Sequence, residues 1–357
     1  DAFETLKNDD CQERIIEAKK TLGEQVVILG HHYQNETVYR HADLTGDSLK
    51  LSKYVSSLEA KYIVFLGVHF MAEVSNILSR PEQITVLPDL SAGCSMADMA
   101  NLTKVERTFR ELSKVLDFNK SITPITYINS AADLKAFCGD HGGVVCTSTN
   151  APTILDWAFK QKEKVLFFPD QNLGRWTGHK MNIPLEEMPI WDPDLPLGGL
   201  DMETIKKAKV LLWKGHCAVH QMFRTEHIDL FRKAHPDGNV ISHPESPFEV
   251  CLNSDFVGST EFILNTIKNS EENTKWLVGT ELNLVNRLAN EMKPEGKLVQ
   301  FMSHVVCECS TMARIDPQHL AWTLENILNN NPVNIIKVPE NELLSAKLAL
   351  DRMLEIS

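Results

Sequence analysis

Short apolar runs rich in valine and isoleucine alternate along this chain with amphipathic segments long enough to form helices. This alternation is typical of βαβ units, in which parallel strands are covered by helices on both faces. We therefore expect an α/β fold built on parallel sheets. The predicted strands are residues 26–30, 62–67, 84–88, 122–128, 143–147, 164–168, 210–213, 239–243, 255–259, 275–279 and 297–301.

The size of the chain predicts more than one structural unit. Its 357 residues exceed the ~250–300 at which a single core usually stops growing. No apolar run approaches the ~18–20 residues of a membrane helix, so no membrane partner is expected. The N-terminal residues are polar and resemble neither a signal peptide nor a transit peptide. These features predict a cytoplasmic protein.

The same order of features occurs three times, which indicates three copies of one unit. Residues 68–78, 146–155 and 257–267 each run from a strand end through small or polar residues into an apolar-periodic helix. Chance similarity among βα units would explain this pattern alone, but not the features around it. One strand earlier stands a polar pair, and one or two strands later stands a cysteine. The pairs are His31 with Tyr33, Tyr127 with Asn129, and His243 with Glu245, and the cysteines are Cys94, Cys217 and Cys309.

The polar pairs lie where an α/β protein binds its ligand. In open parallel sheets, ligands sit beyond the carboxyl ends of the strands, and each pair closes or follows a predicted strand. A single histidine at a strand end is more often structural than catalytic. Three such clusters in corresponding places favour an active site.

The cysteine spacing excludes several common metal and redox motifs. The sequence has no CxxC pair, which argues against a zinc ribbon, a thioredoxin-like site and a ferredoxin-type run. Isolated thiolates from three units could instead bind an iron–sulfur cluster or zinc, leaving one metal position open to substrate. The remaining cysteines in helical or strand patterns are predicted to be small buried hydrophobes: Cys11, Cys138, Cys146 and Cys251.

The net charge of −12 argues against a nucleic-acid partner, because binding to phosphate backbones needs a basic face. Any small anionic substrate must then be held by local groups. Ser48, Ser148 and Thr260 each stand where a helix is about to begin, and helix N-termini attract anions. The alternative interpretation is that these hydroxyls are only N-caps.

Motifs in order along nearly the whole chain resemble the quinolinate synthase family. The matching segments are GHHYQ (30–34), TGDSLKLS (45–52), GVHFMAE (67–73), LPDLSAGCSM (87–96), TYINS (126–130), CTSTNA (146–151), FPDQNLGRW (168–176), WKGHCAVH (213–220), HPES (243–246), VGST (257–260) and CSTM (309–312).

The resemblance implies three pseudo-threefold-related domains, each a small parallel sheet flanked by helices, around a central active site. We place them at residues 1–115, 116–219 and 220–357. It also implies condensation of iminoaspartate (iminosuccinate) with dihydroxyacetone phosphate to quinolinate, releasing phosphate and water, in NAD biosynthesis. L-aspartate oxidase or aspartate dehydrogenase is the implied supplier of the imine.

The resemblance further implies one [4Fe–4S] cluster per chain, with three cysteine ligands, Cys94, Cys217 and Cys309, and one iron open to substrate. Many relatives carry a proline directly after the last of these cysteines, where this chain has Ser310. A second cysteine, Cys307, stands two residues upstream. We assign Cys309 because Met312 keeps the C-x-x-M frame.

The implied site residues follow from the matching motifs. We expect Glu245 and one histidine to carry the elimination steps and Tyr127 to position the triose; a competing view makes Tyr127 and Asn129 purely positioning groups. A zinc-dependent hydrolase or lyase and a non-enzymatic small-molecule binding module are the alternatives. The predicted substrate-binding residues are His31, Tyr33, Ser48, Tyr127, Asn129, Ser148, His243, Glu245 and Thr260, and the predicted catalytic residues are Tyr127, His220, Glu245, His31 and His243.

Overall fold

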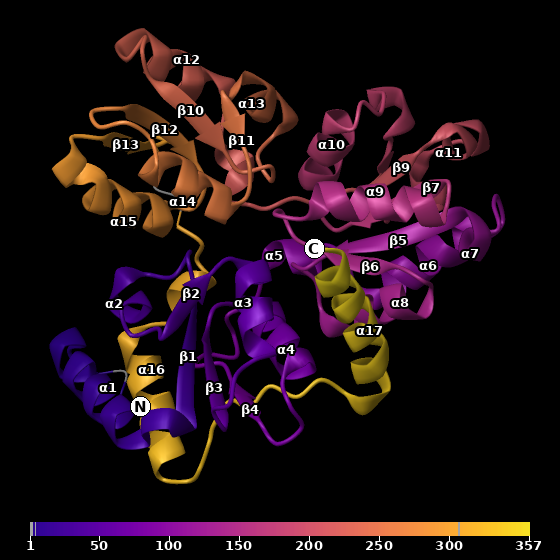
Figure 1. Ribbon diagram of the computed structural model, residues 1–357. Coiled ribbons are helices and arrows are strands. Elements are labelled where there is room, and N and C mark those ends of the chain that lie inside the picture. Colours follow the sequence, from indigo (N-terminus) through magenta and orange to yellow (C-terminus); the bar gives the residue numbers. More distant parts are fainter. Residues whose placement is uncertain (1–2, 4, 306–307) are drawn as a thin grey trace. The chain divides into compact units, whose positions relative to one another are not determined.

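A computed structural model describes residues 3, 5–305 and 308–357 of the chain (Figure 1). The strands of the described residues form three sheets, and their strand pairs are parallel. Helices flank these sheets, so the predicted α/β architecture of three small parallel sheets is confirmed.

The first sheet has the strand order β2-β1-β3-β4. Its strands are β1 (Val26–His31), β2 (Leu44–Gly46), β3 (Tyr62–Leu66) and β4 (Ile84–Val86). Buried apolar side chains fill β3, which explains its place inside the sheet. Helices α1 and α16 pack together beside the sheet (Figure 1). Arg14 of α1 bonds Glu325 of α16 through both carboxylate oxygens. The helices are α1 (Asn8–Leu22), α2 (Glu36–Tyr39), α3 (Ser48–Val55), α4 (His69–Leu78) and α16 (Pro317–Leu328).

The second sheet has the order β6-β5-β7-β9-β8. Its strands are β5 (Ile122–Tyr127), β6 (Val144–Cys146), β7 (Lys164–Phe168), β8 (Ile190–Trp191) and β9 (Val210–Trp213). Helices α8 and α17 approach closely, since a Cβ at Gly139 would lie 2.0 Å from the carbonyl oxygen of Ser345. The helices are α5 (Ser95–Asp98), α6 (Leu102–Leu112), α7 (Phe118–Ser121), α8 (Ala132–Asp140), α9 (Ala151–Gln161), α10 (Gln171–Lys180), α11 (Met202–Lys207) and α17 (Glu340–Ile356).

The third sheet has the order β11-β10-β12-β13. Its strands are β10 (Asn239–Ser242), β11 (Phe256–Val257), β12 (Lys275–Gly279) and β13 (Leu298–Phe301). A buried cluster that includes Phe231, Val240 and Leu277 packs one side of it. Helices α12 (Thr225–Ala234), α13 (Phe248–Asn253), α14 (Thr260–Lys268) and α15 (Leu282–Met292) belong to this region (Figure 1).

The first and third sheets repeat one hydrogen-bond pattern. Asp43, before β2, accepts the N–H of Ile28 on its carboxylate and donates its own N–H to the Ile28 carbonyl, both at 2.8 Å. Asp255, before β11, does the same with Val240, at 2.8 and 2.9 Å. Such matched contacts at equivalent strands support the internal repetition that the sequence predicts.

The chain divides into two compact units. The smaller comprises residues 1–94, 281–287 and 308–339 and contains the first sheet. The larger comprises residues 95–280, 288–307 and 340–357 and contains the second and third sheets. The division into three domains at residues 115 and 219 stays a prediction.

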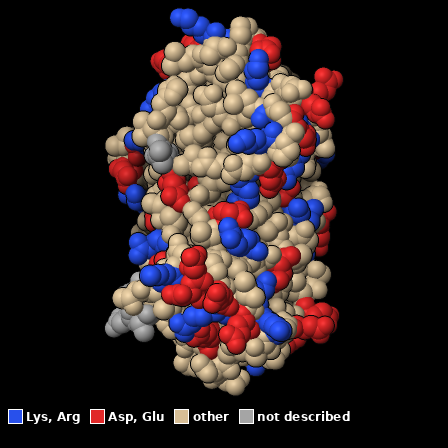
Figure 2. Space-filling model, turned by 90° about the vertical axis from the view of Figure 1, so that its left-hand side faces the viewer, with Lys and Arg blue, Asp and Glu red and all other residues tan. Residues whose placement is uncertain are grey.

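The surface and the helices bear on possible partners. Among the described residues, none of the helices combines the length and the apolar character that crossing a membrane requires. On the face drawn in Figure 2, basic and acidic side chains are interspersed rather than gathered into one patch.

Candidate active site

Two strands of equivalent position end in the same local geometry. After β1, the N–H of Tyr33 donates to Nδ1 of His31 at 3.1 Å. After β10, the N–H of Glu245 donates to Nδ1 of His243 at 3.2 Å. In each case Nδ1 is the acceptor, so the neutral imidazole carries its proton on Nε2. The backbone therefore fixes the tautomer of both histidines.

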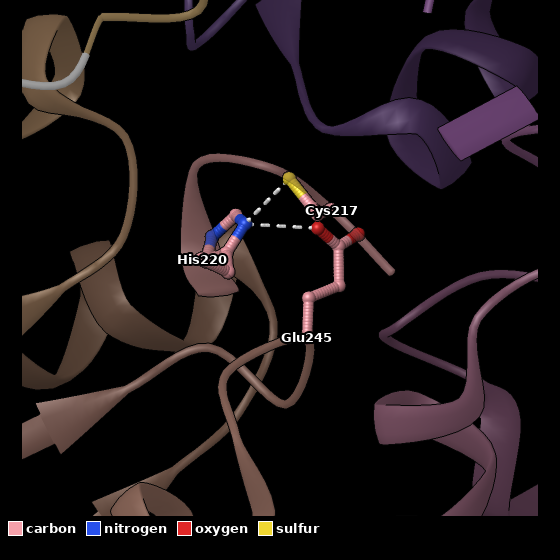
Figure 3. A group of neighbouring side chains, drawn as sticks. All are labelled: Cys217, His220 and Glu245. Atoms are coloured by element: carbon pink, nitrogen blue, oxygen red, sulfur yellow. Dashed lines mark hydrogen bonds and ion pairs between the residues drawn. The ribbon is translucent and has the colours of Figure 1, made fainter. Parts of the chain in front are cut away.

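A row of polar groups, buried except at its last member, lies in the larger unit at the carboxyl ends of the strands. The hydroxyl of Tyr127, at the end of β5, donates to Oε1 of Glu245 at 2.5 Å. Nδ1 of His220 lies 2.9 Å from Oε2 of the same carboxylate and 3.1 Å from Sγ of Cys217. Figure 3 shows the imidazole turned toward both the sulfur and the carboxylate. The row thus leads from a phenol through a carboxylate and an imidazole to a thiol.

Burial and hydrogen bonding set the charge of this row. Glu245 is 4% exposed, and burial opposes its ionisation, but the charge of His220 and the hydrogen bonds from His220 and Tyr127 outweigh that effect and lower its pKa to about 2. Burial lowers the pKa of His243 to about 3. At neutral pH, Glu245 is therefore a carboxylate and His243 is a neutral imidazole.

Predicted hydroxyl and amide groups surround this row or stand at helix starts. Nε2 of His243 lies 3.2 Å from Oγ of Ser148. Asn129 stands two residues after the end of β5 and is partly exposed. Thr260 is the first residue of α14 and is buried, and Ser48 is the first residue of α3, in the smaller unit.

The structure brings together five of the predicted residues of the larger unit, and it brings His31 and Tyr33 together in the smaller unit. Tyr127, His220, Glu245, His243 and Ser148 form one bonded group. In the smaller unit, the rings of His31 and Tyr33 pack edge to face, with centroids 4.7 Å apart.

Comparison with known proteins identifies the family. The family model of "Quinolinate synthetase A protein" matches residues 13–355. The quinolinate synthase of Rhodopirellula baltica is 51% identical to the chain, over 99% of the chain and 93% of that protein. Those of Acidobacterium capsulatum and Herpetosiphon aurantiacus are each 50% identical, over 100% and 99% of the chain and 95% and 94% of those proteins.

The chain belongs to the quinolinate synthetase A family. It is therefore an enzyme of quinolinate synthesis, a step of NAD biosynthesis.

The described cysteines of this family member fall into two groups. The described cysteines are free thiols. Cys11, Cys138, Cys146 and Cys251 are fully buried, as predicted, and burial raises the pKa of each thiol, to about 12 for Cys251. The remaining three are partly exposed on loops: Cys94, Cys217 and Cys309. Cys307 lies outside the described residues.

Donor atoms for a metal ion converge in the same row. Sγ of Cys217, a ring nitrogen of His220 and a carboxylate oxygen of Glu245 all lie within 4.8 Å of one another. A soft thiolate beside an imidazole suits iron or zinc rather than magnesium or calcium. The loop that carries Cys217 can therefore hold a metal centre beside His220 and Glu245.

Several residues that hold this site were not singled out from the sequence. Nδ2 of Asn172 donates to the carbonyl oxygen of Glu245 and to Oε1 of Gln221, both at 3.1 Å. Oγ1 of Thr280 lies 3.2 Å from Nε2 of His220. Asn172 stands in FPDQNLGRW, one of the family segments. The motif therefore marked this position, but it did not indicate that Asn172 bonds the backbone of Glu245. Nothing in the local sequence marks Thr280.

Proposed function

We propose that this chain condenses iminoaspartate with dihydroxyacetone phosphate to quinolinate, releasing phosphate and water. The observation that carries the proposal is the row from the buried Tyr127 through Glu245 and His220 to the partly exposed Cys217. It places groups that move protons directly beside a thiol that can hold a metal. Forming an aromatic ring from these two substrates requires repeated proton removal and loss of water, which is the chemistry such a row provides.

The chemistry of the loop thiols fits an iron–sulfur cluster. We propose one [4Fe–4S] cluster per chain, with Cys94, Cys217 and Cys309 as ligands and one iron open to substrate. Thiolates are the required ligands, and these three cysteines are partly exposed, whereas burial disfavours the thiolate at the other four described cysteines. When bound, the open iron supplies a Lewis acid that polarises an oxygen of the substrate.

The chain's own residues would move the protons. The Glu245 carboxylate is ionised and can accept a proton, while Tyr127 and His220 hold its two oxygens in place. The neutral His243 presents its Nε2 proton toward Ser148, where a substrate oxygen could take the place of that hydroxyl. We assign the elimination steps to Glu245 with one of these histidines, and the positioning of the triose to Tyr127.

The polar groups at strand ends and helix starts would hold the anionic substrates. Ser48 and Thr260 are first residues of their helices, where the positive end of the helix dipole attracts negative charge. We include Ser148, Asn129, His31 and Tyr33 in the same substrate site.

The substrates also indicate the setting of the reaction. Iminoaspartate hydrolyses readily in water, so an enzyme that oxidises aspartate, L-aspartate oxidase or aspartate dehydrogenase, must supply it nearby. Thiolate ligands require a reducing compartment, which supports a cytoplasmic location.

Oxygen-free purification followed by metal, sulfide and quinolinate assays tests this function. We expect iron with acid-labile sulfide, and quinolinate formation from the two substrates. The matched variant Glu245→Gln should keep its iron and sulfide but lose quinolinate formation, because it cannot accept a proton. Zinc without sulfide, or an iron-loaded protein that makes no quinolinate, would contradict the proposal.

A further inference from the structure

A fully buried lysine holds the loop that follows β5. Lys135, on α8, is 0% exposed, and its Nζ donates to the carbonyl oxygens of Ile128, at 2.9 Å, and of Ser130. These two carbonyls stand on either side of Asn129. Oγ of Ser130 lies 3.3 Å from the same Nζ and donates to the carbonyl of Tyr127 at 2.8 Å. The lysine thus fixes the backbone on both sides of Asn129 and, through Ser130, that of Tyr127.

An arginine makes the equivalent contacts in the loop that follows β1. The guanidinium of Arg287, on α15, donates to the carbonyl oxygens of His32 and Gln34, at 2.5 and 3.2 Å. These two carbonyls stand on either side of Tyr33. The guanidinium also lies 3.6 Å from the centroid of the Tyr39 ring, and its side chain is 13% exposed. Stacking and two hydrogen bonds together leave the arginine one orientation.

The two arrangements share one geometry. In each, a cation from a neighbouring helix bonds the carbonyl before and the carbonyl after a polar residue at a strand end. Hydrogen bonds from charged donors are shorter and stronger than neutral ones, so they restrict the backbone more tightly. The third loop is held differently, because Asn172 donates a neutral amide to the carbonyl of Glu245 itself.

We propose that Lys135 and Arg287 are positioning residues, which orient Asn129 and Tyr33 for substrate by bonding the carbonyls on either side of them. The inference rests on the proposed function, in which these two side chains contact substrate. Removing Lys135 or Arg287 would leave the side chain of Asn129 or Tyr33 chemically intact but free to turn away from the substrate. A misplacement of ~1 Å can cost ~10²-fold in rate. We therefore expect each substitution to lower the rate of quinolinate formation clearly in a protein that still folds.

The chain offers matched controls for both residues. Lys164 is a buried lysine whose Nζ also donates to two carbonyls, those of Lys206 and Ala208, but it lies at the first residue of β7, away from the carboxyl ends. Arg352 also donates to a carbonyl, that of Gly143, and stacks over Trp157, and Gly143 precedes β6. Each control loses the same kind of contact at the opposite end of a strand.

Steady-state quinolinate formation by the iron-loaded variants tests the proposal. For Lys135→Met and Arg287→Gln, we expect KM for dihydroxyacetone phosphate to rise, or kcat/KM to fall, by about tenfold or more, with iron content unchanged. For Lys164→Met and Arg352→Gln, we expect a lower melting temperature but kinetic constants within about twofold of those of the unmodified chain. Arg287→Lys should fall between, since it keeps the charge but not the planar fork.

The outcomes separate this inference from the proposed function. If the unmodified chain makes quinolinate and Lys135→Met behaves like Lys164→Met, with lower stability and normal kinetics, positioning by Lys135 is wrong. If Lys135→Met does not fold, the Arg287→Gln and Arg352→Gln pair decides, and equal kinetics in that pair overturns the proposal. Failure of the unmodified, iron-loaded chain to make quinolinate contradicts the proposed function instead.

Discussion

The two histidines beside Glu245 turn their Nδ1 atoms to different partners. His243 accepts a backbone N–H on Nδ1, and burial holds it neutral. His220 turns its Nδ1 to the Glu245 carboxylate at 2.9 Å. At the scale of single residues, the site therefore pairs one histidine with a charge and keeps the other as a neutral donor.

The neutral state of His243 predicts a loss of stability in acid. Its pKa falls from 6.5 to about 3 on folding, so below pH 6.5 the unfolded chain takes up a proton that the folded chain does not. The folded state should lose about 2 kcal/mol between pH 7 and pH 5 from this group alone. The free energy of unfolding in urea, measured at pH 7 and at pH 5, checks this loss. His243→Asn should be less stable at pH 7 but show a pH dependence weaker by that amount; an unchanged dependence would contradict the burial argument.

The choice between the two neighbouring cysteines is testable at the same scale. We expect Cys309→Ser to lose its iron and sulfide, because two thiolates cannot hold a cluster that already exposes one iron. Cys307→Ser should keep both. Iron and sulfide analysis after oxygen-free purification measures this, and the reverse pattern would move the ligand to Cys307.

At the scale of elements, the helix starts correct one interpretation of the sequence. The alternative that Ser48, Ser148 and Thr260 are N-caps is wrong, because other residues occupy the N-cap positions of these helices. Asp47 accepts the N–H of Lys50 for α3, and Ser259 accepts the N–H of Phe262 for α14. Asn150 precedes α9. The preceding residues, Asp47 and Ser259, therefore cap α3 and α14, and Ser48 and Thr260 stand at the first helical position.

This separation allows a paired test of anion binding at α14. Ser259→Ala removes the cap and should cost about 1 kcal/mol of stability with an unchanged KM for dihydroxyacetone phosphate. Thr260→Ala should instead raise that KM clearly, with iron content and folding kept. Thermal unfolding and steady-state kinetics of both variants measure the two effects. A Thr260→Ala enzyme with normal kinetics and a lower melting temperature would refute anion binding there.

Most strands were predictable from the sequence, and the exceptions have physical causes. Buried parallel strands need continuous apolar, β-branched runs, so β7 (Lys164–Phe168) and β12 (Lys275–Gly279) lie where the sequence predicts them. The sequence did not predict β2 (Leu44–Gly46) or β8 (Ile190–Trp191). Both are edge strands of three and two residues, too short to show a period.

The contacts of Lys135 and Arg287 with backbone carbonyls show why part of the site could not be predicted. Lys135 lies in α8, most of whose residues are buried, and Arg287 lies in α15; a surface role would be the usual expectation for either residue type. Their partners are backbone carbonyls, which every residue carries, so the identity of the residues does not reveal the contact. The polar pairs at strand ends were recognisable because their positions recur, whereas Asn172 and Thr280 became visible only from their contacts.

At the scale of the whole molecule, an acidic chain has to bind anionic substrates. With a net charge of −12, general attraction of a dicarboxylate and a phosphate is unavailable. Binding must therefore come from local groups of the site, such as helix N-termini, hydroxyls and neutral imidazoles. This predicts a substrate affinity that depends only weakly on salt, because local hydrogen bonds are screened much less than long-range charge.

Removing the proposed cluster should destabilise the whole chain. A group that binds the folded state but not the unfolded state adds its binding free energy to stability, about 3–4 kcal/mol for a ligand at several hundred times its Kd. We therefore expect the oxygen-free, iron-loaded chain to melt several degrees above the same chain stripped with oxidant and chelator. Cys94→Ser, which lacks one proposed ligand, should show the melting temperature of the stripped chain both before and after chelation. Cys138→Ser, at a buried cysteine outside the ligand set, should still lose melting temperature when it is stripped. Equal melting temperatures for the loaded and stripped unmodified chain would show that the cluster contributes nothing to the fold.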